Sequence, residues 1–192
     1  MKKGEFISGP EFSYEYFREF AGIKFRFVSD DLFLKEIDFY KGKKFNETCS
    51  PPPSAPLSMI VKYFEAYFSG TGAERFSILF RHNFKDKMVI KGSGHGESIV
   101  LDRENYTERE ASVYRELIKI VSGNRISYGD LAAKSGIPGG ARFIGNTMAK
   151  NRFPVIVPCH RVVKSDGSLG NFSGGVDIKE KLLRHEYGLR AS

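Results

Sequence analysis

The order of apolar and polar residues in the first half of the chain predicts strands around a single helix. Residues 23–27 alternate apolar and basic side chains, and residues 32–40 form a second extended run after the turn residues 29–31. We therefore expect a β-hairpin here. Residues 76–80 and 88–90 are further strand candidates.

Between these strands, apolar residues recur at the spacing of a helix. The expected helix begins near Pro56, since proline suits a first helical turn, and it ends at Gly70. Its inward face would consist of Leu57, Ile60, Val61, Phe64, Tyr67 and Phe68. The phenylalanines of this region follow the secondary-structure period, which favours a packed core over a surface for stacking bases.

The second half of the chain predicts helices with clear start signals. Thr107 and Glu110 form a capping box, and an apolar face runs from Val113 to Val121 before Gly123 ends the helix.

Two short helices follow. The first opens at the cap residue Ser127 and ends at Gly136, and a turn at 137–140 leads to the second, over about 141–150. The inward face of the second helix would be formed by Ala141, Ile144 and Met148. Two short helices joined by a tight turn predict a helix-turn-helix motif.

A last helix is capped at 177–180, buries Leu182 and Leu183, and is expected to end at His185 and Glu186. A carboxylate at a helix C-terminus opposes the helix dipole, so Glu186 needs either a compensating partner, such as a histidine, or contact with solvent. The residues alone leave both alternatives open.

The expected fold class is α/β (α+β) in two domains. Glycine and serine dominate residues 91–96 and no periodicity crosses them, which indicates a domain boundary. We place an N-terminal α/β domain at 1–92, a linker at 93–104, and a mainly helical C-terminal domain with the helix-turn-helix at 105–192.

The apolar run 154–157 predicts a buried strand that Pro158 stops, which would place Cys159 at the rim of a core. An imidazole and a guanidinium follow, His160 and Arg161, and such electropositive surroundings lower a thiol pKa and favour a nucleophile. An isolated cysteine is more often a small buried hydrophobic residue, but this context favours reactivity.

Neighbouring residues of an extended segment point to opposite faces, so Cys159 and His160 are not expected to touch. We expect His160 to deprotonate Cys159 through a bridging water, with Glu186 holding the imidazole as the third group of a relay.

Charge favours a polyanionic partner. The net charge is +7, and the stretch between Leu131 and Ser165 holds no acid but several basic residues. These are Lys134, Arg142, Lys150, Arg152, Arg161 and Lys164. A solvated basic face is the plain alternative, but the second helix of the helix-turn-helix lies in this stretch, which favours DNA.

Other classes of function are disfavoured. The glycine-rich loop 167–175 lacks the Gly-Lys-Ser/Thr ending of a phosphate loop, and Cys49, His82 and His95 are too scattered for a zinc site. No apolar run is long enough for a membrane span and no signal peptide is evident, so we expect a cytoplasmic protein without a structural metal.

Several motifs in consistent spacing carry a family resemblance. They are Ile-Ser-Tyr-Gly-Asp-Leu-Ala (126–132), Arg-Phe-Ile-Gly (142–145), Ile-Val-Pro-Cys-His-Arg-Val-Val (156–163), Gly-Asn-Phe-Ser-Gly-Gly (170–175) and Lys-Glu-Lys-Leu-Leu-Arg-His-Glu (179–186). Together, over roughly 105–188, they closely resemble the O6-alkylguanine-DNA alkyltransferases, or methylated-DNA-protein-cysteine methyltransferases. The resemblance implies a ribonuclease-H-like N-terminal domain.

The resemblance also implies an activity: flipping O6-alkylguanine, and also O4-alkylthymine, out of duplex DNA and transferring the alkyl group irreversibly and stoichiometrically to Cys159. No cofactor is implied, because the damaged DNA is the donor. The implied partner is double-stranded DNA, bound by a monomer through the minor groove with little sequence preference, in the nucleoid-associated cytoplasm.

The resemblance assigns roles residue by residue. The catalytic set would be Cys159, His160, Glu186, Tyr128 and Asn151, with Tyr128 protonating the departing oxygen. The DNA-binding set would be Arg142, Gly145, Asn146, Lys150 and Arg152, with Arg142 as a finger filling the space of the flipped base. The guanine pocket would be formed around Val162, Ser168, Leu169, Ser173 and Met148.

Two alternatives remain in other classes. A lesion sensor of the alkyltransferase-like type would lack the acceptor cysteine, whereas Cys159 is present. A cysteine hydrolase would need an oxyanion hole and turnover, and it would leave Tyr128, Arg142 and the basic helix unexplained.

Overall fold

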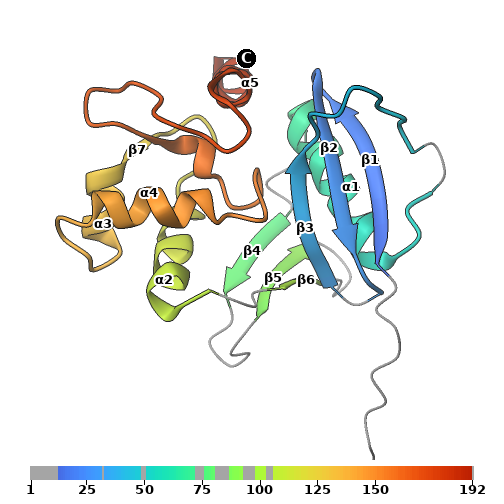
Figure 1. The fold of residues 1–192 in the computed structure, drawn as a ribbon, viewed down its shortest axis with the longest axis horizontal. Helices are drawn as coiled ribbons and strands as arrows, with labels where there is room; N and C mark the ends of the chain where they lie inside the picture. Colours follow the sequence, from blue (N-terminus) through green and yellow to red (C-terminus); the bar gives the residue numbers. More distant parts are fainter. Residues whose placement is uncertain are drawn as a thin grey trace, which may run out of the picture.

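The computed structural model describes residues 13–31, 33–48, 51–71, 76–80, 87–92, 98–102 and 106–191. Figure 1 shows a twisted sheet with one helix packed against it and, beside the sheet, a mainly helical part that contains the second half of the chain. The coarse prediction of a mixed α/β fold is confirmed. No helix within these described ranges is both long and apolar enough to span a bilayer.

The sheet has six strands in the order β1-β2-β3-β6-β5-β4. Its two antiparallel halves are β1 (Tyr14–Phe20), β2 (Ile23–Ser29) and β3 (Phe33–Phe39), and β4 (Phe76–Phe80), β5 (Lys87–Gly92) and β6 (Ser98–Asp102). A short parallel pairing of β3 with β6 joins the halves. The predicted hairpin is β2 and β3, whereas β1, which pairs with β2 along its whole length, was not predicted.

Helix α1 (Ala55–Ser69) covers one face of the sheet and confirms the expected helix. Ser54 caps its N-terminus by accepting from the Leu57 amide, and Gly70 ends it with φ of 73°, a conformation that glycine adopts without strain. The ring of Phe64 lies 5.0 Å from those of Phe25 and Phe27 on β2, so aromatic contacts join helix and sheet.

The helical part contains α2 (Glu108–Leu117), α3 (Tyr128–Lys134), α4 (Ala141–Ala149) and α5 (Val176–Ala191). The capping box of Thr107 and the cap at Ser127 form as expected, and α3 and α4 are the two helices of the predicted helix-turn-helix. A two-stranded parallel sheet pairs β7 (Ile126–Ser127) with β8 (Val162–Val163). This pairing holds the start of α3 beside the 3₁₀ turn η2 (Cys159–Arg161).

The predicted strand at 154–157 is wrong. This run is buried, but it is a turn: the Val157 amide donates to the Phe153 carbonyl over 2.9 Å, and Val155 has φ of 74°. An apolar β-branched run indicates burial, and periodicity alone does not separate a buried strand from a buried turn.

Two predicted helix ends are also wrong. Helix α2 stops at Leu117 instead of continuing to Gly123, and Val121 is exposed. Helix α5 continues past Glu186 to Ala191, so Glu186 is not at a helix terminus and the expected dipole conflict does not arise. Ala141, expected to face inward, is exposed at the start of α4.

Strand β6 lies inside the segment expected as a linker, 93–104. The sheet therefore extends past the expected end of the N-terminal domain at residue 92. The glycine-rich signal at 91–96 begins within β5, and the next strand, β6, pairs with β5, so the sheet continues beyond this signal.

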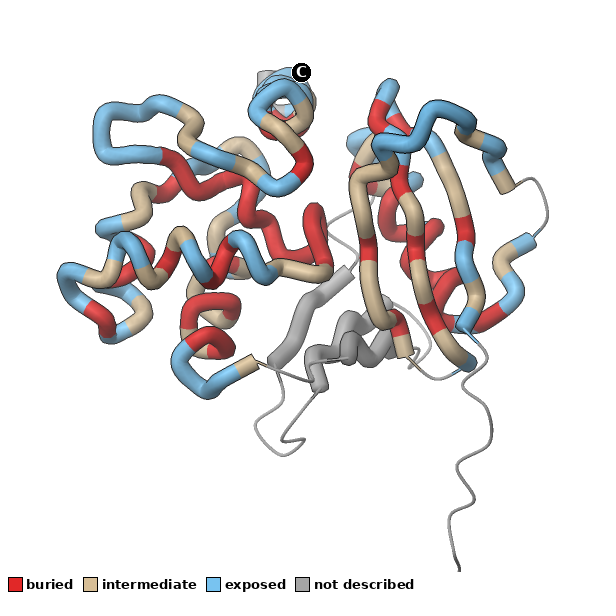
Figure 2. Tube along the Cα trace, viewed as in Figure 1, coloured by how far each residue is buried: buried red, intermediate tan, exposed pale blue. Residues whose placement is uncertain are grey.

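Buried side chains of the sheet, α1 and the helical part form one continuous apolar cluster, from Tyr16 on β1 to Leu182 on α5. Figure 2 shows buried positions on β2, on α1 and along the segment that leads into η2. The two parts of the chain thus share a core, and η2 lies at their junction.

Candidate active site and DNA interface

A cavity of about 940 Å³ lies beside the helix-turn-helix, and the side chain of Cys159 contributes to its wall. Its other lining residues come from α3, α4 and the 164–173 loop: Tyr128, Gly129, Ala141, Arg142, Gly145, Asn146, Met148, Ala149, Lys164, Ser165, Gly170, Asn171, Phe172 and Ser173. The rest of Cys159 is buried, with 3% of the residue exposed, so it lies inside the core and not at its rim.

Asn151 fixes the sulfur of Cys159 in place. Its Nδ2 donates to the Val157 carbonyl over 2.9 Å and to Sγ of Cys159 over 3.0 Å, and its Oδ1 accepts from the Phe153 amide. Asn151 lies two residues after the end of α4, so one amide side chain connects this helix to the turn that carries the thiol.

Burial raises the pKa of the Cys159 thiol to about 11, although the Asn151 hydrogen bond and the charge of Lys179 act in the opposite direction. The expectation that neighbouring cations lower this pKa is therefore wrong. Arg161 points away from the thiol, toward Glu186. A thiol with such a pKa is protonated at neutral pH and needs a base when it reacts.

Lys179 on α5 is the cation that acts on the thiol, and its side chain is fully buried. Its Nζ donates to the Val162 carbonyl over 2.6 Å and to the Leu169 carbonyl. Burial lowers the pKa of Lys179 to about 8. The ammonium thus links β8 to the loop that lines the cavity.

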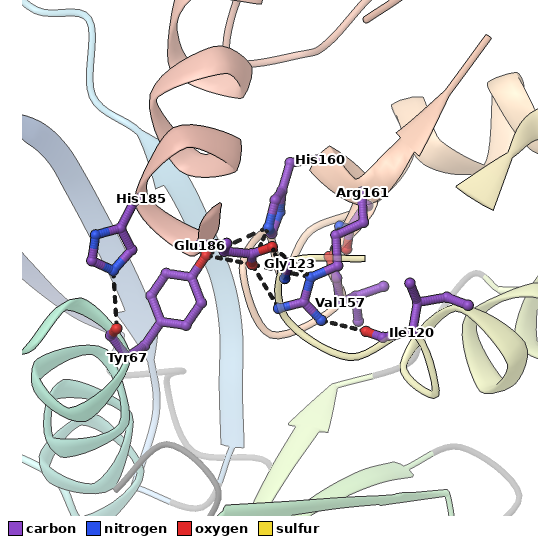
Figure 3. A network of polar contacts seen from close by, with 9 residues as sticks. Tyr67, Ile120, Gly123, Val157, His160, Arg161, His185 and Glu186 are labelled. Atoms are coloured by element: carbon purple, nitrogen blue, oxygen red, sulfur yellow. Dashed lines mark hydrogen bonds and ion pairs between the residues drawn. The ribbon is translucent and has the colours of Figure 1, made fainter. Parts of the chain in front are cut away.

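A buried polar network surrounds the carboxylate of Glu186 (Figure 3). Oε1 of Glu186 lies 2.8 Å from Nε2 of His160, 2.7 Å from the hydroxyl of Tyr67 and 2.6 Å from Nη2 of Arg161. Oε2 accepts from the Gly123 amide over 3.2 Å. The expected contact between His160 and Glu186 is present.

Charge in this network determines which nitrogen of His160 carries the proton. Burial alone would raise the pKa of Glu186, but the hydrogen bonds and charges of His160 and Arg161 hold it well below its usual range. An ionised carboxylate only accepts hydrogen bonds, so Nε2 of His160 is the donor. Burial lowers the pKa of His160, which favours the neutral ring and leaves Nδ1 as a free acceptor.

Nδ1 of His160 is buried and has no hydrogen-bond partner among the residues that the structure describes. A buried acceptor without a partner is rare in proteins and points to a group that takes up a proton or binds a water. The imidazole therefore has the tautomer that a general base needs.

The network also explains why α2 ends early. Arg161 donates through Nη1 to the Ile120 carbonyl, and Glu186 accepts from the Gly123 amide. The segment after Leu117 is thus held by the site, and its backbone groups bond to side chains instead of extending the helix.

Tyr128 lines the cavity from the first residue of α3. Burial, and secondly the charge of Cys159, raise the pKa of Tyr128, so its phenol keeps its proton. A Cβ atom at Gly170 would lie 3.3 Å from the Tyr128 hydroxyl, so this glycine allows the loop to approach the phenol closely.

The expected DNA-binding residues separate into two groups. Arg142, Gly145 and Asn146 line the cavity on α4. Lys150 forms an ion pair with Glu110 over 2.7 Å, and with Arg152 it lines a second cavity, of about 620 Å³, on the side of the sheet.

The expected guanine-pocket residues also divide. Met148 and Ser173 line the cavity, whereas Val162, Ser168 and Leu169 are not among its lining residues. Val162 and Leu169 contribute carbonyl groups to Lys179 instead, and Ser168 is exposed in a turn with Asp166.

Among the described residues, no group of His, Cys, Asp and Glu side chains could hold a metal ion. Cys49, His82 and His95, weighed above as ligands, lie outside the described residues.

Two residues of the site were missed in the sequence analysis, and both had a signal. Lys179 precedes Leu182, Leu183 and Glu186 at helical spacing, which places a lysine on the buried face of α5. Tyr67 was assigned to the apolar face of α1, but a buried tyrosine hydroxyl normally needs a hydrogen-bond partner.

Comparison with known proteins gives consistent results. Residues 108–188 match the family model described as "6-O-methylguanine DNA methyltransferase, DNA binding domain". A human methylated-DNA–protein-cysteine methyltransferase is 47% identical over 144 residues, covering 71% of this chain and 61% of the human protein. A protein of the same name from Shigella flexneri is 33% identical over 129 residues, covering 66% of this chain and 75% of that protein.

Solved structures share the fold. Mycobacterium tuberculosis OGT in complex with DNA superimposes with a TM-score of 0.66 at 24% identity, covering 91% of this chain and 93% of that one. The O6-methylguanine-DNA methyltransferase of Pyrococcus kodakaraensis gives a TM-score of 0.60.

The aligned regions amount to 61% of the human relative and 41% of a rat relative, so the chain spans about half the length of these two proteins. The Shigella relative is matched over most of its length. On this evidence, the chain belongs to the family of methylated-DNA–protein-cysteine methyltransferases.

Proposed function

We propose that the protein repairs DNA by flipping an O6-alkylated guanine out of the duplex and moving the alkyl group irreversibly to Cys159, once per molecule. One observation supports this above all: Cys159 lines a cavity beside a helix-turn-helix, and the next residue, His160, has a buried Nδ1 without a hydrogen-bond partner among the described residues. O4-alkylthymine is a second substrate that the same chemistry would serve.

The proposed step begins at the thiol. A water passes the proton of Cys159 to Nδ1 of His160, while Glu186 keeps the ring oriented and stabilises the imidazolium. The sulfur attacks the alkyl carbon, a C–S bond forms, and the C–O bond breaks. The O6 oxygen leaves with the electron pair and takes a proton from Tyr128, so restored guanine and a thioether result.

We propose the DNA contacts by position. Arg142, Gly145 and Asn146 lie on the cavity face of α4, so they would meet the minor groove, where little sequence information is available, and Arg142 would fill the space of the flipped base. Lys150 and Arg152 would contact the backbone. Met148 and Ser173 would form the base pocket. Val162 and Leu169 would shape it through their bonds to Lys179, and Ser168 would lie at its outer edge.

We further propose a ribonuclease-H-like character for the N-terminal domain, a division into domains at 1–92 and 105–192 with residues 93–104 between them, a monomer as the active form, and work on nucleoid DNA in the cytoplasm. A sheet crossed by one helix supports the ribonuclease-H-like character. The transfer step needs one thiol and one general base, which supports the monomer.

The decisive experiment incubates the protein with a duplex that contains O6-methylguanine and measures the mass of the peptide that holds Cys159. We expect one methyl group per protein and restored guanine in the DNA. The unmethylated duplex is the control. An unmodified peptide with intact methylated DNA would contradict the proposal.

A matched variant separates chemistry from binding. Cys159→Ala should abolish transfer and leave DNA affinity within about twofold, because binding depends on charge and on α4. Equal loss of both would contradict the separate roles of the thiol and the helix.

A further inference from the structure

The hydroxyl of Tyr67 belongs to α1, in the part of the chain before the helix-turn-helix, yet it lies inside the site. It donates to Oε1 of Glu186 over 2.7 Å and lies 3.5 Å from Nε2 of His160. Tyr67 is 3% exposed. Among the described residues, it is the one side chain of the sheet-and-α1 part that bonds to this carboxylate.

Tyr67 is fixed from two sides, so its hydroxyl has a defined position. Nε2 of His185 lies 3.1 Å from the Tyr67 carbonyl, and the two rings are 5.5 Å apart. The Tyr67 ring also stacks on that of Tyr63, one turn earlier in α1, at 6.4 Å. Helix α5 therefore contacts both the backbone and the hydroxyl of this one residue (Figure 3).

The hydroxyl and the imidazole share one acceptor atom. Oε1 of Glu186 accepts from Tyr67, from His160 and from Arg161. Each donor weakens the attraction that the Glu186 carboxylate exerts on the other donors, and each restricts the position of the carboxylate. A change in the Tyr67 hydroxyl thus changes both the position of Glu186 and its pull on the His160 proton.

We propose that Tyr67 is a positioning residue of the transfer reaction, supplied by the N-terminal part of the chain, which holds Glu186 against His160 through its hydroxyl. The inference rests on the proposed function. It gives that part of the chain a direct contribution to the chemistry in addition to its role in the shared core.

The effect on pH dependence has a defined sign. The ionisable groups that act on His160 or contact Tyr67 are Tyr63 on α1, Arg161 on η2, and Lys179, His185 and Glu186 on α5. Without the Tyr67 hydroxyl, Glu186 keeps more charge for His160, which stabilises the imidazolium. His160 must be neutral to accept a proton. As the pH is lowered, transfer should therefore begin to slow at a higher pH in a variant without the Tyr67 hydroxyl than in the wild type.

The test measures single-turnover methyl transfer from an O6-methylguanine duplex between pH 5 and 9 for the wild type and Tyr67→Phe. Tyr14→Phe is the matched control, because it removes a hydroxyl that bonds to the carboxylate of Asp31 over 3.0 Å in the sheet, away from the site. We expect Tyr67→Phe to be about fivefold to tenfold slower below neutral pH, the effect of about one hydrogen bond, with its acid limb at higher pH. Tyr14→Phe should match the wild type.

A double-mutant cycle shows whether Tyr67 acts through Glu186. In a Glu186→Gln background, Tyr67→Phe should slow transfer by less than about twofold, since the neutral amide has no charge to share. An unmoved acid limb, or the same loss in both backgrounds, overturns the inference. If the wild type itself forms no methyl adduct, the proposed function fails instead, and the two failures are thereby distinguished.

Discussion

At the scale of single residues, the thiol of Cys159 and the ammonium of Lys179 are coupled through burial. The core raises the pKa of the thiol to about 11, and the charge of Lys179 is one of the few effects that oppose this rise. Lys179 itself is held by two carbonyl groups. The lysine thereby lowers the free energy needed to form the thiolate, which is the nucleophile of the proposed transfer.

We predict that Lys179→Met slows methyl transfer about tenfold at neutral pH, because loss of the charge raises the thiol pKa by about one unit. The expected signature is a rate that recovers as pH rises. Lys181→Met, two residues along on the exposed side of α5, is the control and should leave the rate unchanged. A Lys179→Met protein with the wild-type rate would exclude this role.

We also predict that Glu186→Ala lowers the free energy of unfolding by about 3–5 kcal/mol, because it leaves Arg161 buried without its partner. Urea unfolding measures the loss. Glu180→Ala on the same helix removes an exposed ion pair with Arg184 and should cost less than about 1 kcal/mol. Similar costs for both variants would show that the buried network does not stabilise the fold.

The same carboxylate predicts acid sensitivity. The folded protein holds the pKa of Glu186 below the value of the unfolded chain, so its contribution to stability is complete above about pH 4.5 and is lost as the pH falls through the folded pKa. Unfolding midpoints measured between pH 7 and pH 3 should fall for the wild type. In Glu186→Gln this fall should be smaller.

Sequence reasoning at this scale identified the residues with distinctive chemistry and missed those whose role depends on packing. Cys159, His160 and Glu186 were expected together, and the latter two are in contact. The sign of the Cys159 pKa shift was wrong, because burial dominates the shift and the sequence neighbours His160 and Arg161 both bond to Glu186.

At the scale of elements, α4 presents a glycine on the face that lines the cavity. A Cβ atom at Gly145 would meet nothing within 4 Å, so the fold itself does not require glycine there. Glycine inside a helix costs about 1 kcal/mol relative to alanine. Its presence on this face is therefore understandable if another molecule approaches the backbone closely.

We predict that Gly145→Ala raises the free energy of unfolding by up to about 1 kcal/mol and weakens binding to duplex DNA. Thermal unfolding and a DNA titration measure the two effects. Gly188→Ala on α5, where a Cβ also meets nothing within 4 Å, is the control for helix stabilisation alone. Unchanged DNA affinity in Gly145→Ala would place the DNA on another face.

Helices with caps could be predicted from sequence, and elements set by distant contacts could not. Thr107 and Ser127 cap helices as their local sequence indicates, and the helix expected from Pro56 is capped by Ser54. The end of α2 depends instead on Arg161 and Glu186, which lie far along the chain. The turn at 154–157 is buried within the apolar cluster that both parts of the chain share.

At the scale of the whole molecule, the two halves of the chain share one core and one polar network. Besides Tyr67, contacts between them include the ring pair Phe39 and Phe172 at 5.4 Å and the bond from Nζ of Lys41 to the Ser173 carbonyl over 3.2 Å. A Cβ atom at Gly174 would overlap the Phe39 ring, so the loop approaches β3 as closely as glycine allows.

We predict that the protein unfolds in urea as a single cooperative unit. Circular dichroism measures the loss of secondary structure in the whole chain. Thiol labelling of the Cys159 peptide, read by mass, measures opening of the junction between the two parts at η2. The two midpoints should coincide. Exposure of Cys159 well before the loss of secondary structure would show that the parts separate first.

The burial of Cys159 has a further consequence for a molecule that works once. A thiol with a pKa of about 11 holds on the order of a hundredfold less thiolate at neutral pH than one with a pKa of 9. Stray oxidants and electrophiles react with thiolates, so the idle protein is protected from being spent on them. Under the proposed function, the burial that keeps the thiol protonated in the idle protein also keeps it available for the single transfer.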